Sequence, residues 1–391
     1  MKEMVFIFIG GYLPGKKYGG PVTSIENFVN CLYNSYDIRI ICADHDFNEI
    51  ERYKNINKGW NKVGNAQVIY INESDYSEKC FHKILIPYAD RIVMVYLSGI
   101  YYYRMNIPAI RAAKRLKLPI VVAPRGDLMA NAISMKGTIS KIKKMVFLYL
   151  MRCSSLYDKV YIQATSDEEK KGAIKYLGIP KSKIFLIPNL TGKPRNNVHE
   201  KKQNSLRMLF ISRIMIKKNL LDVIKALELI PEGFNIVFDI FGPIESIEYW
   251  DRCQKEVSKI NSIDIEVNYK GILDPVTAKG IYQQYDCFVF PTLSENFGHV
   301  IAEAMMTNCP VLLTKGTTPW DDYENNGVYL SKLHDVNGLA KNILRFAKMD
   351  GRQYVDEITK NNQFIRSHQR IEEQIDQYKE MINTVSLGRD K

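Results

Sequence analysis

Continuous apolar runs of strand length alternate with helical segments along most of the chain, and this alternation limits the fold more than any other feature. The runs lack polar alternation, which is typical of parallel strands covered on both faces. In the first half they are Val5–Ile9, Ile38–Cys42, Val68–Ile71, Ile92–Tyr96, Ile120–Ala123, Val160–Gln163 and Ile184–Ile187, with helical stretches such as Pro21–Tyr33 and Ile107–Leu116 between them. The alternation predicts an α/β fold with doubly wound parallel sheets.

A polar stretch interrupts this alternation near the middle of the chain. Residues 189–206 are rich in Asn and Lys and lack apolar periodicity, which is typical of a linker. The alternation then restarts, and a chain of this length exceeds one compact core. We expect a first domain over residues 1–190, a linker over 191–206 and a second domain over 207–360. A helical segment over 361–391 is expected to pack back toward the first domain.

The composition is that of an ordinary globular protein, with 46% hydrophobic and 25% charged residues. It excludes collagen-like, disordered and disulfide-framework classes. No apolar stretch approaches the roughly twenty residues of a membrane-spanning helix, and the N-terminal apolar run is too short for a signal peptide. The seven Cys and six His lack metal-ligand spacing. We expect a cytoplasmic protein with free thiols and no metal.

The excess of positive charge is confined to the first half of the chain. Residues 1–190 contain 28 Lys and Arg against 16 Asp and Glu, whereas residues 191–391 contain 26 against 27. Nucleic acid, acidic lipid and phosphorylated small molecules all qualify as the anionic partner. The segment Lys136–Arg152 interleaves basic and apolar residues. It can lie on an anionic membrane as an amphipathic helix, or pack its apolar face on its own sheet.

Three strand-to-helix loops carry candidate functional residues. The first strand runs into a glycine-rich loop that ends at Gly19 and Gly20. Such a loop can bring backbone N–H groups close to a phosphate, or it can be a plain tight turn. After the strand Met208–Ile211 come Arg213 and Lys218. These two cations suit a diphosphate, although exposed Arg and Lys need no partner.

The most specific stretch is Cys287–Met306, in which a buried strand, a loop and a helix follow one another. Glu295 in the loop can bind sugar hydroxyls, and Glu303 in the helix can accept two hydrogen bonds from a ribose diol. Gly298 and the amides after it can approach a phosphate or sugar oxygen. Glu303 could instead be a surface residue, but its small apolar neighbours indicate a largely buried helix in which a carboxylate needs a partner.

The segment S-E-N-F-G-H-V-I-A-E-A-M, residues 294–305, resembles the E-x7-E signature of the retaining nucleotide-sugar glycosyltransferases of family 4, also called glycosyltransferase group 1. Further landmarks occur in the family's order over roughly residues 4–320: Gly19-Gly20, Pro124-Arg125-Gly126, Ile187-Pro188-Asn189, Ser212-Arg213 with Lys218, and Gly271. The chain has Pro124-Arg125-Gly126 where the family often has P-H-G, and Leu190 where IPNG is common. The resemblance implies the GT-B fold, with two Rossmann-like doubly wound domains facing each other across a cleft.

The resemblance also implies roles for individual residues. Arg213 and Lys218 match the pair that contacts the donor diphosphate, Glu295 the carboxylate on the donor sugar, and Glu303 the one on the ribose. Other donor-binding positions are Gly19, Gly20, Gly271, Ile272, Asn296, Phe297, Gly298, His299 and Val300. Arg125, Asp127 and Tyr101 are candidates on the acceptor side, with Asp127 also a candidate base.

The expected function is that of a retaining glycosyltransferase that moves a sugar from a nucleotide-diphosphate sugar, with a UDP-sugar favoured, to a glycan acceptor. The resemblance implies a lipid-linked acceptor in bacterial surface polysaccharide synthesis, contact with the inner face of the plasma membrane, and no cofactor or metal. Two alternatives stay open: a nucleotide-sugar epimerase of the same fold, and a basic nucleic-acid-binding protein. The sequence contains no known nucleic-acid-binding module, so no nucleic acid is expected as a partner.

Overall fold

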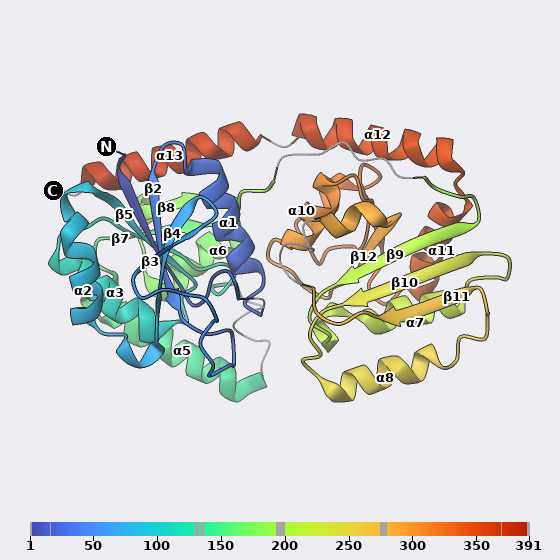
Figure 1. Cartoon of the computed structure of the whole chain (residues 1–391), viewed down its shortest axis with the longest axis horizontal. Helices are drawn as coiled ribbons and strands as arrows, with labels where there is room; N and C mark the ends of the chain where they lie inside the picture. Colours follow the sequence, from blue (N-terminus) through green and yellow to red (C-terminus); the bar gives the residue numbers. More distant parts are fainter. Residues whose placement is uncertain are drawn as a thin grey trace. The chain divides into compact units, whose positions relative to one another are not determined.

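The computed structural model describes residues 2–388, except 16, 130–132, 134–136, 193–199, 274–279 and 369. Lys136 of the expected basic helix and residues 193–199 of the expected linker thus lie outside the described residues. The chain forms two compact units (Figure 1): unit 1 comprises Met1–Leu190 and Ile371–Lys391, and unit 2 comprises Thr191–Arg370.

Unit 1 is built on an eight-stranded sheet with the order β3-β4-β2-β1-β5-β6-β7-β8. The strands are β1 (Met4–Ile9), β2 (Asp37–Ala43), β3 (Trp60–Val63), β4 (Ala66–Ile71), β5 (Ile92–Ser98), β6 (Ile120–Ala123), β7 (Val160–Ala164) and β8 (Ile184–Leu186). Neighbouring strands are parallel, except that β3 pairs antiparallel with β4 at the edge. The sequence does not predict β3, because its four residues are polar or partly exposed and give no apolar run.

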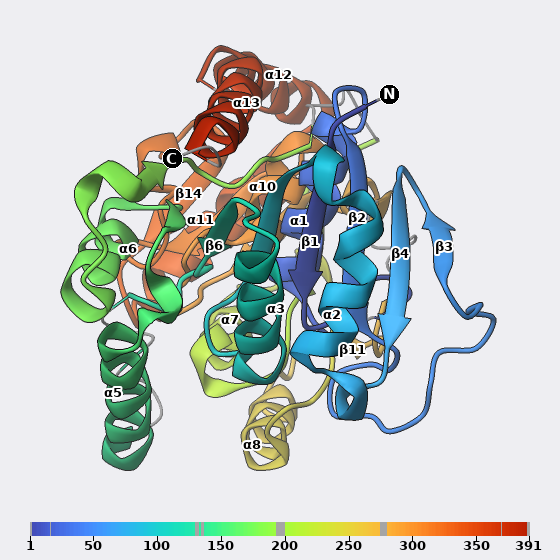
Figure 2. The same cartoon turned by 90° about the vertical axis from the view of Figure 1, so that its left-hand side faces the viewer.

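Helices cover both faces of this sheet, as a doubly wound fold requires. The larger ones are α1 (Gly20–Leu32), α2 (Glu78–Leu85), α3 (Tyr103–Arg115), α5 (Gly137–Cys153), α6 (Asp167–Gly172) and α13 (Ile371–Leu387). Alternate residues of β1 point into two separate cores: Phe6 packs with α2 and α3, and Ile7 packs with α1 and α13. Figure 2 shows α2 and α3 lying over one face of the sheet.

Unit 2 is built on a six-stranded parallel sheet with the order β11-β10-β9-β12-β13-β14. Its strands are β9 (Ser205–Ile211), β10 (Asn235–Phe241), β11 (Ile265–Tyr269), β12 (Cys287–Phe290), β13 (Val311–Thr314) and β14 (Val328–Ser331). Its larger helices are α7 (Leu220–Glu228), α8 (Ile247–Val257), α10 (His299–Met306), α11 (Val336–Lys348) and α12 (Gly351–His368). The strand order reverses beside β9, and ligands of such sheets bind at the carboxyl ends of the strands near that point.

The end of the chain differs from the expected division at residue 360. Helix α12 is continuous from Gly351 to His368 and buries Tyr354, Ile358 and Ile365 in the core of unit 2. The chain enters unit 1 only at α13, where the Tyr378 hydroxyl donates to the Pro188 carbonyl at 3.2 Å. None of the helices in the described part of the chain combines the length and the apolar character that crossing a bilayer requires.

Candidate active site

The loop after β9 is held by backbone contacts to the loop after β10. The Ser212 N–H donates to the Phe241 carbonyl at 3.0 Å, and the Ile214 N–H donates to the Pro243 carbonyl at 2.9 Å. Gly242 has a φ of 135°, and a Cβ on it would lie 1.9 Å from the Ser212 carbonyl oxygen. Only glycine permits this approach, so the position of Arg213 depends on Gly242.

Arg213 is paired with a carboxylate that the sequence analysis did not single out. Its Nη1 lies 2.8 Å from Glu245 Oε2, and the two side chains are 51% and 43% exposed. The predicted diphosphate-binding cation therefore has a counter-ion from the loop after β10. Its role toward a diphosphate stays a prediction.

Lys218 and Glu295 form an ion pair between two predicted catalytic residues that are 77 positions apart in the sequence. The Lys218 side chain is 9% exposed, that of Glu295 is 21% exposed, and the Lys218 Nζ lies 4.9 Å from the Phe290 ring centroid. The pair forms because β9 and β12 are neighbours. The Leu293 N–H also donates to the Lys217 carbonyl at 2.8 Å, which joins the two loops.

The surroundings of this pair keep Glu295 ionised. Burial alone would raise the pKa of the Glu295 carboxyl, but Lys218, then Lys217 and the Asn296 N–H, hold it below its ordinary value. Burial lowers the pKa of the Lys217 ammonium, the charge of Glu295 opposes this shift, and nearby Lys218 and Arg213 add to it. Lys217 is thus a third cation at the site. Lys217 is not among the residues predicted from the sequence, although it adjoins Lys218.

The segment from Asn296 to Val300 is fixed by its glycine and by aromatic packing. Gly298 has a φ of 73°, and a Cβ there would lie 2.7 Å from the Ile301 Cδ1. The ring of Phe297 lies 4.8 Å from that of His299 and 5.3 Å from that of Trp320, whose Nε1 donates to the Phe297 carbonyl. His299 is buried, whereas Asn296, Phe297 and Val300 are partly exposed.

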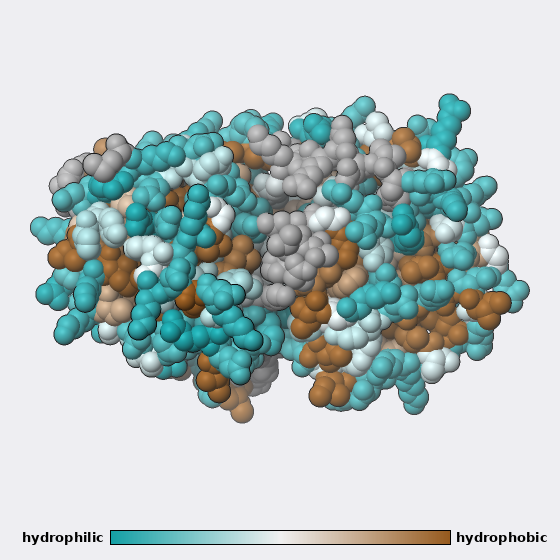
Figure 3. Space-filling model, in the orientation of Figure 1, coloured by the Kyte–Doolittle hydropathy of each residue, from teal (hydrophilic) through white to brown (hydrophobic). Residues whose placement is uncertain are grey.

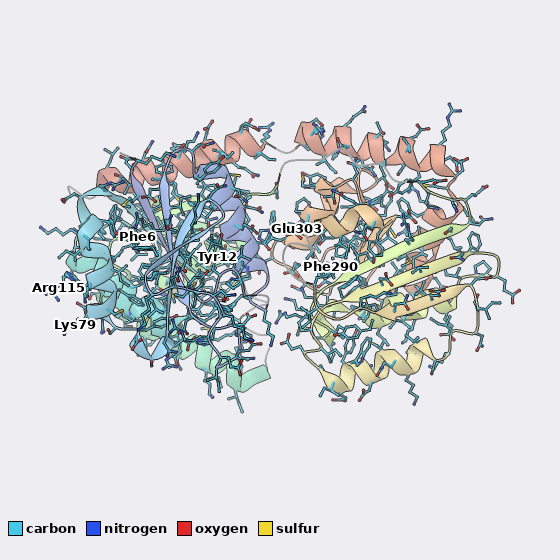
Figure 4. The ribbon with its side chains drawn as sticks, viewed as in Figure 1. Phe6, Tyr12, Lys79, Arg115, Phe290 and Glu303 are labelled. Carbon is cyan, nitrogen blue, oxygen red and sulfur yellow. The ribbon has the colours of Figure 1, made fainter. Side chains whose placement is uncertain are left out.

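Glu303 has the kind of partner that a carboxylate in a largely buried helix needs. The hydroxyl of buried Tyr282 donates to Glu303 Oε2 at 3.2 Å. Burial, followed by the charge of Glu303, raises the pKa of Tyr282 well above its ordinary value, so the phenol remains a donor. Figure 4 shows Glu303 on α10 and Phe290 at the end of β12 within unit 2.

The two predicted nucleobase positions follow β11 at the same edge of the sheet. Gly271 has a φ of 79°, its carbonyl accepts from the Gly242 N–H at 2.8 Å, and a Cβ on it would meet nothing within 4 Å. Ile272 is 47% exposed. Given the strand order β11-β10-β9-β12, the edge presents Ile272, Glu245, Arg213 and Glu295 in succession.

Gly19 and Gly20 belong to unit 1, where they lead from β1 into α1. Gly19 has a φ of 68°, its carbonyl accepts from the Val22 N–H at 3.0 Å, and a Cβ there would meet nothing within 4 Å. Gly20 is the first residue of α1. The backbone conformation explains a glycine at Gly19, and its contact with a phosphate stays a prediction.

The three acceptor-side candidates divide into two groups. The Arg125 guanidinium binds the Asn189 side chain and donates to the Tyr96 hydroxyl at 2.8 Å, so it ties parts of unit 1 together. Asp127 instead accepts from the Ile100 N–H at 2.9 Å, and the Tyr101 hydroxyl lies 3.4 Å from the Asp127 carbonyl. Burial raises the pKa of the Asp127 carboxyl to about 6, which suits proton exchange near neutral pH.

Comparisons with known proteins agree with the resemblance drawn from the sequence. Residues 194–364 match the family model of the glycosyl transferases of group 1. The capsular polysaccharide biosynthesis glycosyltransferase CapM of Staphylococcus aureus is 25% identical over 186 residues, 46% of this chain and 47% of that protein, so the match spans about half the relative's length. An uncharacterized 41.2 kDa protein in the cps region of Klebsiella pneumoniae is 23% identical over 75% of this chain and 77% of its own.

Solved structures show the same fold over nearly the whole chain. Anabaena Alr3699/HepE in complex with UDP and glucose has a TM-score of 0.67 at 12% identity, covering 98% of this chain and 100% of its own. A variant of Staphylococcus aureus TarM in complex with UDP and saccharides has a TM-score of 0.67 at 13% identity, covering 97% and 100%. The fold that the resemblance implied is confirmed, because the chain has the GT-B fold, and residues 194–364 match the family model of the glycosyl transferases of group 1.

Proposed function

We propose that the protein is a retaining glycosyltransferase that moves a sugar from a UDP-sugar to a glycan acceptor. The observation that carries this proposal is the group of Arg213, Lys217 and Lys218 around Glu295, at the adjoining carboxyl ends of β9 and β12. Fixed cations at such a position stabilise the charge that develops on a leaving diphosphate. A UDP donor is supported by HepE, whose structures include complexes with UDP and with UDP-glucose.

The reaction breaks the bond between the anomeric carbon of the donor and the β-phosphate oxygen. Arg213 and Lys218 neutralise that oxygen, and the ionised Glu295 accepts a hydrogen bond from a hydroxyl of the donor sugar. Glu303 accepts from the ribose hydroxyls. The acceptor hydroxyl attacks the same face of the sugar and gives its proton to the leaving phosphate. Cations of the protein neutralise the leaving group, so the proposal includes no metal.

Asp127 is the proposed contact for the acceptor hydroxyl in unit 1. Its carboxyl has a pKa of about 6, so it is mainly ionised above pH 7 and can accept a hydrogen bond from a hydroxyl. Tyr101 lies beside it, with the Lys144 Nζ 5.2 Å from its ring centroid. This arrangement supports a neutral, hydroxyl-bearing group as the acceptor.

The acceptor is proposed to be a lipid-linked oligosaccharide used in bacterial surface polysaccharide synthesis. The names of the relatives support this, since one is a capsular polysaccharide biosynthesis glycosyltransferase and another lies in a cps region. Helix α5 supports contact with an anionic membrane. It exposes large apolar side chains, each between 39% and 74% accessible: Ile139, Ile142, Met145, Val146, Tyr149 and Leu150. The basic residues Lys141, Lys143 and Arg152 on the same helix are also exposed.

The charge around α5 fits this surface as well. Residues 137–153, which form α5, contain Lys141, Lys143, Lys144 and Arg152 and no acidic residue. Leu148 is buried and Phe147 packs against the core, so one face of α5 packs on unit 1 while the other is exposed. Figure 3 shows apolar atoms at the lower rim, where Figure 1 draws α5. Apolar groups next to cations favour an anionic lipid surface.

Vesicle flotation tests the membrane contact. We expect the protein to float with phosphatidylglycerol-containing vesicles and not with pure phosphatidylcholine. The double variant Ile142→Glu with Tyr149→Glu removes the binding, because it puts charge on the exposed apolar face of α5. Ile247→Glu on α8 changes a side chain that is 73% exposed and serves as the control. Equal flotation of the double variant would contradict the membrane contact.

A thermal-shift panel of UDP, GDP, ADP and CMP with EDTA present tests the donor site. A ligand that binds only the folded protein at about a hundred times its Kd adds about 2.7 kcal/mol of stability. We expect UDP to stabilise the wild type and not Glu303→Ala.

With a UDP-sugar and a glycan acceptor, the product is UDP and an extended glycan with the donor's anomeric configuration. An isomerised sugar still attached to UDP would indicate the epimerase instead.

A further inference from the structure

The carboxylate of Glu245 lies beside the cation that the donor diphosphate needs. Glu245 Oε2 is 2.8 Å from Arg213 Nη1. With Glu245 included, the edge of unit 2 carries three cations, Arg213, Lys217 and Lys218, and two carboxylates, Glu245 and Glu295. Glu245 competes with a phosphate for Arg213, because a guanidinium forms charge-assisted hydrogen bonds to carboxylates and phosphates alike.

The backbone holds Glu245 in this place. The Glu245 N–H donates to the Ile214 carbonyl at 3.1 Å, and Ile214 pairs with Ile244 in a β-bridge. On the other side, Ser246 caps α8, with its Oγ accepting from the Tyr249 N–H at 3.3 Å. Arg213 and Glu245 therefore flank one fixed contact between two loops, which keeps their side chains within reach of each other.

The two ion pairs of the site differ in burial. The Lys218–Glu295 pair is largely buried, at 9% and 21% exposure, and Lys217 lies beside it. The Arg213–Glu245 pair is 51% and 43% exposed. Exposed pairs are weak and exchange readily, whereas breaking a buried pair leaves a charge without compensation. Of the two carboxylates, Glu245 is the one that a diphosphate can displace.

We propose that Glu245 is an exchangeable counter-ion for Arg213. It holds the guanidinium when the donor site is empty, gives it up to the diphosphate of the donor, and takes it back as the nucleoside diphosphate leaves. The exchange weakens nucleotide binding and speeds product release. Glu245 is a positioning residue, since it acts on the substrate through Arg213. The inference rests on the proposed donor site.

Glu245→Gln tests the inference, because it keeps the shape of the side chain and removes its charge. The probes are UDP and inorganic pyrophosphate, measured by titration calorimetry. We expect both to bind the variant about three- to tenfold more tightly at low ionic strength, as expected when a carboxylate close to an anion is neutralised. The gain shrinks at high salt, because partly exposed charges are screened. Slower release of UDP in stopped flow is the kinetic counterpart.

Glu256→Gln is the matched control. It removes the same charge from the far end of α8, where Glu256 pairs with Lys259 at 2.7 Å in a partly exposed position, and it leaves both affinities unchanged. A second test places Glu245→Gln in an Arg213→Ala background. If Glu245 acts through Arg213, most of the gain is lost there, as a double-mutant cycle measures.

Each other outcome overturns a distinct statement. If UDP and pyrophosphate bind Glu245→Gln as tightly as the wild type or more weakly, the counter-ion role is wrong. If Glu245→Gln raises the affinity equally in the Arg213→Ala background, Glu245 only repels the anion and does not act through Arg213. If neither probe binds the wild type or the variant, the donor site itself is wrong and the proposed function fails with it. Binding to the variant alone supports the inference. The thermal midpoint of each variant verifies folding.

Discussion

At the scale of single residues, the surroundings of each buried carboxylate decide its pKa. Glu295 is kept ionised by Lys218 although it is buried. At Asp127 in unit 1, burial outweighs the Ile100 N–H and the charge of Lys144, so the pKa of the carboxyl is raised to about 6. Two carboxylates that look alike in the sequence are thus shifted in opposite directions by their surroundings. This difference predicts that the two carboxylates change the free energy of unfolding with pH in opposite directions.

Lys218→Met is expected to abolish transfer and to destabilise unit 2. Removal of the ammonium leaves the Glu295 carboxylate poorly compensated, at a cost of about 1–3 kcal/mol at pH 7. The pKa of Glu295 is held below its ordinary value, so its contribution is present above about pH 4 and is lost as the pH falls through the native pKa. Denaturant titrations should therefore differ between wild type and variant at pH 7, and the difference should shrink as the pH falls below the native pKa of Glu295. A variant with Glu295→Gln as well should regain part of the loss, and a pH-independent loss would contradict the electrostatic origin of the effect.

Asp127→Asn should make the protein more stable at neutral pH while it impairs transfer. The native pKa of about 6 lies above the ordinary value, so folding favours the protonated carboxyl and the wild type loses stability between about pH 4 and pH 6. The variant gains up to about 3 kcal/mol at pH 7.5 and nothing near pH 4. Thermal midpoints over this range measure the difference. Asp90→Asn, at an exposed position, should show no such trend, and a gain at pH 4 would refute burial of the Asp127 charge as the cause.

At the scale of elements, the site is a set of loops joined at the carboxyl edge of one sheet. Backbone hydrogen bonds link the loop after β9 to the loops after β10 and β12, and Gly242 permits the first of these contacts. The side chains of the site are placed by this framework. A change in the framework should therefore affect binding without touching any side chain of the site.

Gly242→Ala tests this dependence. Its φ of 135° and the 1.9 Å approach of a Cβ to the Ser212 carbonyl oxygen force the two loops apart. The expected cost is at least about 2 kcal/mol of stability, together with a loss of UDP affinity because Arg213 shifts. Gly271→Ala has a positive φ but open space around it, so about 1 kcal/mol is expected from backbone strain alone. Equal effects of the two substitutions, measured by denaturation and calorimetry, would count against the framework.

The sequence predicts those parts of these elements that depend on local pattern. Continuous apolar runs such as Val5–Ile9 and Cys287–Phe290 identify buried parallel strands. The glycine and carboxylates of residues 295–303 predict a donor segment, and that role stays a prediction. The sequence does not predict the edge strand β3, because that strand has no apolar run. It also does not predict the division between α12 and α13, because no Gly or Pro marks it. The pairing of Arg213 with Glu245 is also not predicted, since the two residues are 32 positions apart and meet only where their loops contact each other.

At the scale of the whole molecule, the chain returns to its first unit after completing the second. Helix α13 buries Tyr378, Met381, Ile382 and Val385 in the core formed by α1 and one face of the sheet of unit 1. The Tyr378 ring centroid lies 5.5 Å from that of Phe28. The Tyr378 hydroxyl donates to the carbonyl of Pro188, near the end of the first chain segment of unit 1. Unit 1 is therefore completed by its last residues.

Met381→Ala should destabilise unit 1 and leave unit 2 unchanged. Met381 is fully buried, and truncation of such a side chain costs about 2–5 kcal/mol through lost burial and the cavity that remains. In calorimetry we expect a lower transition for unit 1, while UDP raises mainly the transition of unit 2, because that unit holds Arg213, Lys218 and Glu303 of the proposed nucleotide site. Leu387→Ala, at a side chain that is 76% exposed, should leave both transitions in place. A shift of the UDP-sensitive transition by Met381→Ala would show that α13 supports unit 2 instead.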